Sequence, residues 1–137
     1  MRLFLLLVFG IIHSSCGEDL KTDSAKEEGV TKRGELSLDS KIFLGNRLFS
    51  EKTCITCHDV HLEKKGPSVI DIMHVYKEKN ASIELFLRGK SKPIVDTTAS
   101  QVAIMQDNIN GFLQKVTDED LNAIATYMLH VKDLTSK

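Results

Sequence analysis

The stretch Cys54-Ile55-Thr56-Cys57-His58 decides how the rest of this sequence is interpreted. Two cysteines three positions apart, with a histidine directly after the second, are typical of a site where haem is attached covalently. The two thiols add to the vinyl groups of the porphyrin as thioethers, and the adjacent imidazole can then bind the iron from the same side. Because the chain has only three Cys and five His among 137 residues, composition alone makes such a run improbable. The stretch therefore predicts a site for haem c.

A Cys-x-x-Cys pair has two other common uses. A thioredoxin-like redox pair follows a strand and opens a helix within alternating β and α patterns, and nothing before Cys54 has the pattern of that strand. A structural zinc site needs a second pair of ligands, and neither a second Cys-x-x-Cys nor a spaced His pair follows. We therefore favour haem, with a redox dithiol and zinc as the alternatives.

The amino terminus has the pattern of an export signal. Arg2 is followed by the apolar run 3–12 and then by His13-Ser14-Ser15-Cys16. The run is too short for a membrane-spanning helix, which needs about 20 apolar residues, and its flanks fit a signal peptide. The serines before Cys16 resemble a bacterial lipobox, although His13 stands where that motif usually has Leu. The resemblance implies cleavage before Cys16 and acylation of its thiol and amine. Cleavage near Gly17, which would release a soluble periplasmic protein, is the alternative.

The next segment has the composition of a linker. Residues 17–39 are charged, mixed in sign and poor in large apolar side chains, so they cannot bury enough surface to offset their ordering entropy. A flexible chain of this length spans about 25–30 Å r.m.s.. We expect three parts: a signal peptide over 1–15, a lipid-anchored tether over 16–39, and one folded domain over 40–137. This organisation predicts a membrane-anchored lipoprotein on the periplasmic side.

The folded domain starts with a helical pattern. Ser40 can cap a helix on which Ile42, Gly45 and Phe49 share one face. With the haem motif, this helix resembles the start of a small bacterial monohaem class I cytochrome c. Weaker matches follow in the same order: Gly66-Pro67, Tyr76, a short helix over 82–88 closed by Gly89, Met105, and a terminal helix with Tyr127. The resemblance covers 40–137 and implies an all-α fold of three to five helices around one covalently bound haem.

The terminal helix is also predicted from its own residues. Thr117 is a good N-cap, and three acidic residues follow it at the positive end of the helix dipole. Apolar residues then repeat at helical spacing: Leu121, Ile124, Ala125 and Met128. The family resemblance implies that this helix crosses the first one, with Gly45 and Phe49 meeting Tyr127.

The second axial ligand of the iron is open to several side chains. The candidates are His61, Met73, His74, Met105, Met128 and His130. Met128 and Met73 fit apolar core positions better, and His61 follows His58 too closely to reach the other side of a ring. The family carries its ligand on a loop before the last helix, which is where Met105 stands, although Gln106 replaces the Pro that often follows. An open distal site and His74 are the alternatives to Met105.

The expected function depends on that ligand. Thioether ligation favours reduced iron and raises the potential, which suits an electron carrier and not an enzyme. By resemblance, the carbonyl of Pro67 accepts the second ring N–H of His58 and fixes its tautomer; a plain turn is the alternative. A haem peroxidase or gas sensor with an open distal site, and a fixed haem subunit of a larger membrane complex, are the competing functions.

The net charge limits the classes of partner that this protein can be expected to bind. The net charge is −1, and removing residues 1–15 takes away only the charge of Arg2 and makes it −2. This balance argues against nucleic acid. We expect a monomer that docks transiently with redox proteins and contacts the membrane through lipid on Cys16.

Overall fold

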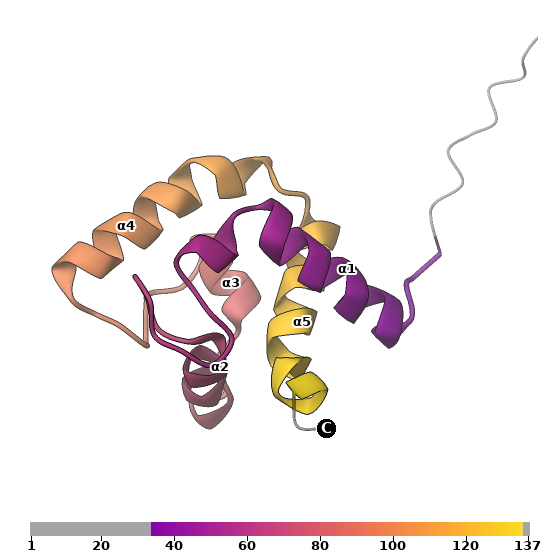
Figure 1. Ribbon diagram of the computed structural model, residues 1–137. Helices are drawn as coiled ribbons and strands as arrows, with labels where there is room; N and C mark the ends of the chain where they lie inside the picture. Colours follow the sequence, from indigo (N-terminus) through magenta and orange to yellow (C-terminus); the bar gives the residue numbers. More distant parts are fainter. Residues whose placement is uncertain (1–33, 136–137) are drawn as a thin grey trace, which may run out of the picture. The chain divides into compact units, whose positions relative to one another are not determined.

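The computed structural model describes residues 34–135. The chain divides into two units, Met1–Arg33 and Gly34–Lys137, so the expected signal, Cys16 and most of the expected tether lie outside the described residues. Five α-helices and two 3-10 helices, with no strand, make up residues 34–135 (Figure 1). They are α1 (Leu38–Glu51), η1 (Cys54–Thr56), α2 (Val69–Glu78), α3 (Ile83–Leu87), α4 (Ala99–Asn110), η2 (Phe112–Lys115) and α5 (Asp118–Thr135). The all-α prediction is confirmed.

The first helix begins earlier than the sequence pattern indicates. The hydroxyl of Ser37 accepts a hydrogen bond from the backbone N–H of Ser40, so Ser37 is the N-cap and α1 starts at Leu38. The prediction of Ser40 as the cap is wrong by about one turn of helix, and α1 begins two residues before the expected start of the folded domain at residue 40. Both serines can cap, but a cap at Ser37 also places Asp39 in the first turn, where the helix dipole favours negative charge.

Helices α1 and α5 cross in close contact (Figure 1). A Cβ atom added to Gly45 would lie 2.0 Å from the carbonyl oxygen of Ala123 and 2.7 Å from the Cβ of Tyr127. The rings of Phe49 and Tyr127 pack at a centroid distance of 5.6 Å and an angle of 57°. The predicted crossing is therefore confirmed, and it requires a residue without a side chain at position 45.

The cap predicted for the terminal helix is present, and two further helices are capped by serine. The hydroxyl of Thr117 accepts from the N–H of Asp120 at the start of α5. Ser68 caps α2 and Ser82 caps α3 in the same manner. Gly89, at φ +69°, follows α3 in the left-handed conformation that glycine adopts without strain. Most of the core comes from α2 and α5, whose buried side chains include Ile72, Met73, Tyr76, Leu121, Ile124 and Met128.

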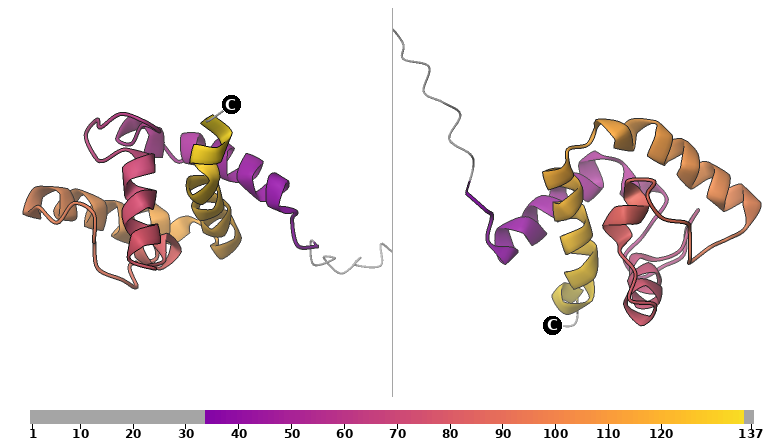
Figure 2. Two further views of the ribbon diagram at one scale, coloured as in Figure 1. Left: turned by 90° about the horizontal axis from the view of Figure 1, so that it is seen from below. Right: turned by 180° about the vertical axis from the view of Figure 1, so that it is seen from behind.

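Helix α4 is the element that differs most from expectation. Met105 lies in the middle of this helix and not on a loop. The reason is local: Ala, Gln and Met are good helix formers, and Gln106 stands where a Pro would prevent the helix from continuing. Ile109 is the one buried residue of α4, and in all three views the helix lies away from α5 over most of its length (Figures 1 and 2). Among residues 34–135, no helix combines the length and apolarity needed to cross a membrane.

Candidate functional site

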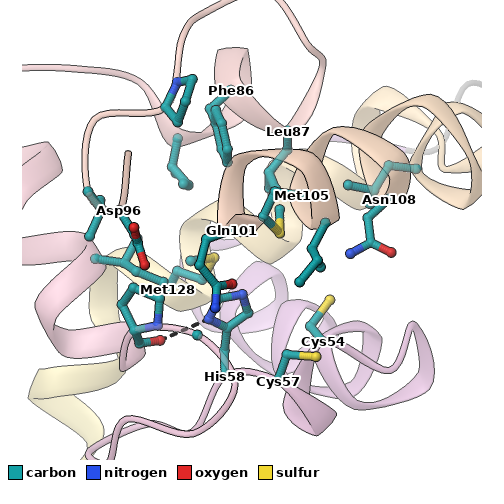
Figure 3. Close-up of a pocket in the computed structure, with 18 of the residues that line it drawn as sticks. Cys54, Cys57, His58, Phe86, Leu87, Asp96, Gln101, Met105, Asn108 and Met128 are labelled. Carbon is teal, nitrogen blue, oxygen red and sulfur yellow. Dashed lines mark hydrogen bonds between the residues drawn. The ribbon is translucent and has the colours of Figure 1, made fainter. Parts of the chain in front are cut away.

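A tight turn after α1 presents the haem motif. Thr53 adopts a left-handed backbone conformation at φ 62°, which is rare for a β-branched residue. Its carbonyl accepts from the hydroxyl of Thr56 at 2.7 Å, and the carbonyl of Cys54 accepts from the N–H groups of Cys57 and His58 at 3.1 and 3.0 Å. This single turn of η1 directs the side chains of Cys54, Cys57 and His58 into one pocket (Figure 3).

The imidazole of His58 is held by the following segment. Its Nδ1 lies 2.8 Å from the carbonyl oxygen of Pro67. A carbonyl can only accept, so Nδ1 carries the proton and Nε2 keeps its lone pair for a metal. A Cβ added to Gly66 would lie 2.6 Å from Cε1 of the ring. Gly66 and Pro67 thus orient the ring by close contact and by a hydrogen bond.

The pocket is large and mostly apolar. Its empty space, including the part open to solvent, is about 1310 Å³. Apolar side chains from five helices line it, among them Phe49, Ile72, Leu87, Met105, Leu121 and Ile124. Such a lining suits a flat apolar group with its attachment points on one side. Two thiols and one imidazole nitrogen supply those points, so the residues present fit haem c.

The predicted axial candidates separate clearly in the structure. Met105 lines the pocket from α4, opposite the turn that carries His58 (Figure 3). Met128 also lines it, from α5, but its side chain is 5% exposed and belongs to the core. Met73 is in the core and does not line the pocket. The other three candidates do not line it either: His61, His74 and His130.

Burial and hydrogen bonds shift the pKa of one group in the turn and of one in the loop that follows it. Burial raises the pKa of the Cys54 thiol, and the neighbouring Cys57 adds to the effect. The backbone N–H groups of His61 and Leu62 donate to Asp59 and hold the pKa of its carboxyl below the usual range, with a smaller contribution from Lys64. The loop is therefore fixed from within before it reaches Gly66.

The sequence did not indicate two polar side chains of the pocket. Gln101 and Asn108 line it on either side of Met105 (Figure 3). Their spacing of four and three residues from Met105 places all three on one helical face. The signal was present in the sequence, but it has this meaning only for a helix, and a loop was expected there.

Comparison with known proteins decides the family. The cytochrome c family matches residues 43–132, which include the haem motif and reach from α1 into α5. The chain belongs to the cytochrome c family. A cytochrome c-552 from Hydrogenobacter thermophilus is 27% identical over 90 residues, which are 66% of this chain and 84% of that protein. Cytochromes c hold haem c covalently and carry electrons, and the Cys-x-x-Cys-His run of this cytochrome c has the spacing typical of such attachment.

Proposed function

We propose that this cytochrome c carries one haem c, bound through Cys54 and Cys57, with its iron held between His58 and Met105. It would transfer one electron at a time between protein partners outside the cytoplasm. The observation that supports this proposal is the arrangement of the pocket. Two thiols and an imidazole with a free Nε2 face it from one turn, and a thioether faces it from the opposite helix.

Each side chain has a distinct task in this proposal. The haem supplies the redox chemistry when bound, and the protein supplies orientation and electronic tuning. Pro67 keeps the proton on Nδ1 of His58, which leaves Nε2 as an electron-pair donor. The thioether of Met105 would favour the reduced state and raise the potential. With His58 and Met105 both holding the iron, oxygen and peroxide would be kept from it.

The experiment for covalent attachment uses all three cysteines. Wild-type protein, Cys54→Ala, Cys57→Ala and the double variant are matured in a host that attaches haem c, with Cys16→Ser as the matched control. We expect intact mass and haem absorbance under denaturing conditions to show one haem per chain in wild type and in Cys16→Ser, and none in the double variant. Colourless wild-type protein, with both thiols open to alkylation, would contradict the proposal.

The proposed location depends on Cys16. Acylation of this thiol would keep the cytochrome at the membrane surface, where it docks transiently with redox proteins. In fractionated cells, Cys16→Ser should move the haem absorbance from the membrane fraction to the soluble periplasmic fraction. If wild type is already soluble, the signal is cleaved elsewhere and the anchor is rejected.

The position of Met105 supports a second candidate function, a gas sensor or peroxidase with an exchangeable distal ligand. Its side chain is only partly buried, on a helix with a single buried residue. Rapid and complete binding of carbon monoxide to the reduced protein would favour this function, while slow or absent binding favours the electron carrier.

A further inference from the structure

Helix α4 has few attachments to the rest of the domain. Its one buried residue, Ile109, lies in its last turn, and its N-terminal half contributes none to the core. Within the described residues, its side chains form one hydrogen bond to a segment distant in the chain: Gln101 Nε2 donates to the carbonyl of Lys65 at 2.8 Å. The second glutamine of the helix, Gln106, donates within α4, to Asn110.

The segment that accepts this hydrogen bond, residues 65–67, also orients the ring of His58. The N–H of Gly66 donates to the carbonyl of Cys57 at 3.1 Å, and Gly66 itself is buried against the ring of His58. Pro67 accepts from that ring. Residues 65–67 therefore contact α4 through the carbonyl of Lys65, and they contact His58 through the carbonyl of Pro67.

We propose that Gln101 is a positioning residue: its hydrogen bond to Lys65 holds α4 against residues 65–67 and so keeps Met105 over the iron. The inference rests on the proposed function, because it assumes that Met105 is the ligand. Gln101 precedes Met105 by one helical turn on the face that lines the pocket. A shift of the free N-terminal half of α4 moves both side chains together, and the hydrogen bond to Lys65 opposes that shift.

The size of the effect follows from the type of bond. A neutral amide-to-carbonyl hydrogen bond that is partly open to water contributes a few-fold to an opening equilibrium, and about tenfold at most. Replacement by Glu should act more strongly than replacement by Ala, because a carboxylate cannot donate and repels the carbonyl of Lys65.

The experiment compares Gln101→Ala and Gln101→Glu with Gln106→Ala, all as holoprotein. Gln106 is the matched control, since it is the same residue type on the same helix and bonds only within it. We expect hydrogen exchange of the amides of residues 99–106 to quicken about fivefold in Gln101→Ala and more in Gln101→Glu. Exchange should be unchanged in Gln106→Ala and, in every variant, across α5.

Two readouts report on the iron itself. Carbon monoxide association with the reduced protein should quicken as amide exchange does, about fivefold in Gln101→Ala and more in Gln101→Glu. The far-red thioether-to-iron band of the ferric protein should bleach at a lower temperature. Equal exchange and equal carbon monoxide rates in Gln101→Ala and Gln106→Ala would overturn the proposal.

A separate variant distinguishes failure of this inference from failure of the ligand assignment. If Met105→Ala keeps the far-red band, Met105 is not the ligand. The role of Gln101 in holding Met105 over the iron is then rejected, even if hydrogen exchange shows that Gln101 holds α4 in place. If Met105→Ala loses the band while Gln101→Ala matches its control, the ligand assignment stands and the positioning role of Gln101 is rejected.

Discussion

Helices α1 and α4 are of similar length, 14 and 12 residues, and both border the haem pocket, yet they are held in different ways. Helix α1 is fixed by the polypeptide, because Gly45 and Phe49 lock it against α5. Helix α4 is fixed at its last turn by Ile109, and over most of its length it faces the pocket. The side of the pocket that carries the haem motif, after α1, is therefore held in place by packing. The opposite side, formed by α4, has few such contacts.

The sequences of the two helices explain this contrast. Buried positions of α1 recur at Gly45, Leu48 and Phe49, and a continuous apolar face of this kind is what a packed helix needs. The face of α4 toward the pocket mixes Gln101, Met105 and Asn108. A mixed face gains little from burial against an apolar core, so we expect polar bonds, such as the one from Gln101 to Lys65, and contact with the haem to hold α4.

The largest expected effect is on the α1–α5 crossing. In Gly45→Ala the added methyl would meet the backbone of Ala123 at 2.0 Å, so the two helices must move apart, and we expect a loss of about 3 kcal/mol in the free energy of unfolding. Gly34→Ala is the matched control, since its Cβ has no neighbour within 4 Å. Urea unfolding followed by circular dichroism measures both. An unfolding free energy for Gly45→Ala close to that of the control would show that the crossing is not tightly packed.

The next effect tests how α4 is attached. Ile109 is 2% exposed and Ile104, on the same helix, is 50% exposed. We expect Ile109→Ala to cost about 2 kcal/mol or more, and Ile104→Ala less than about 0.5 kcal/mol. Hydrogen exchange should show the loss in α4 and η2 before α1 and α5. Equal losses in all four elements would mean that α4 and α1 share one packed core after all.

A smaller effect is expected at the proximal ligand. In Gly66→Ala the new Cβ would lie 2.6 Å from the ring of His58, so the ring must move and its bond to Pro67 must lengthen. We expect a cost of about 1–2 kcal/mol in stability and a change in reduction potential, because the hydrogen bond tunes the basicity of the ligand. Cyclic voltammetry of the holoprotein measures the change. An unchanged potential would mean that the Gly66–Pro67 segment does not orient the ring.

The smallest effect concerns pH. Burial raises the pKa of Tyr76, which is 3% exposed, from 10.0 to about 12. As the pH rises above about 10, the unfolded chain loses this proton while the folded chain keeps it, so stability falls between about pH 10 and 12. Tyr76→Phe lacks this part of the fall, a difference of at most about 1 kcal/mol at about pH 11. Urea unfolding of both proteins at about pH 9 and 11 measures it; parallel losses would show that the phenol is solvated.

The contrast between the two sides of the pocket also explains what could be predicted from sequence. The cap at Thr117 has a local physical meaning, and the structure confirmed it. The contact of Gly45 and Phe49 with Tyr127 was implied by the family resemblance, and the structure confirmed it as well. The haem motif is equally local, because one turn carries all three side chains. The helical state of residues 99–110 was missed because the family's loop outweighed local helix propensity. The hydrogen bond of Gln101 to Lys65 joins residues far apart in the chain, and no local sequence pattern predicts such a contact.

The absorption spectrum of the ferric holoprotein tests the central claim, that the iron lies between His58 and Met105, most directly. Wild type is compared with Met105→Ala and with Met128→Ala, the other methionine that lines the pocket. The account predicts a far-red thioether-to-iron band in wild type and Met128→Ala, and its loss in Met105→Ala. A band that persists in Met105→Ala, or disappears in Met128→Ala alone, would contradict it.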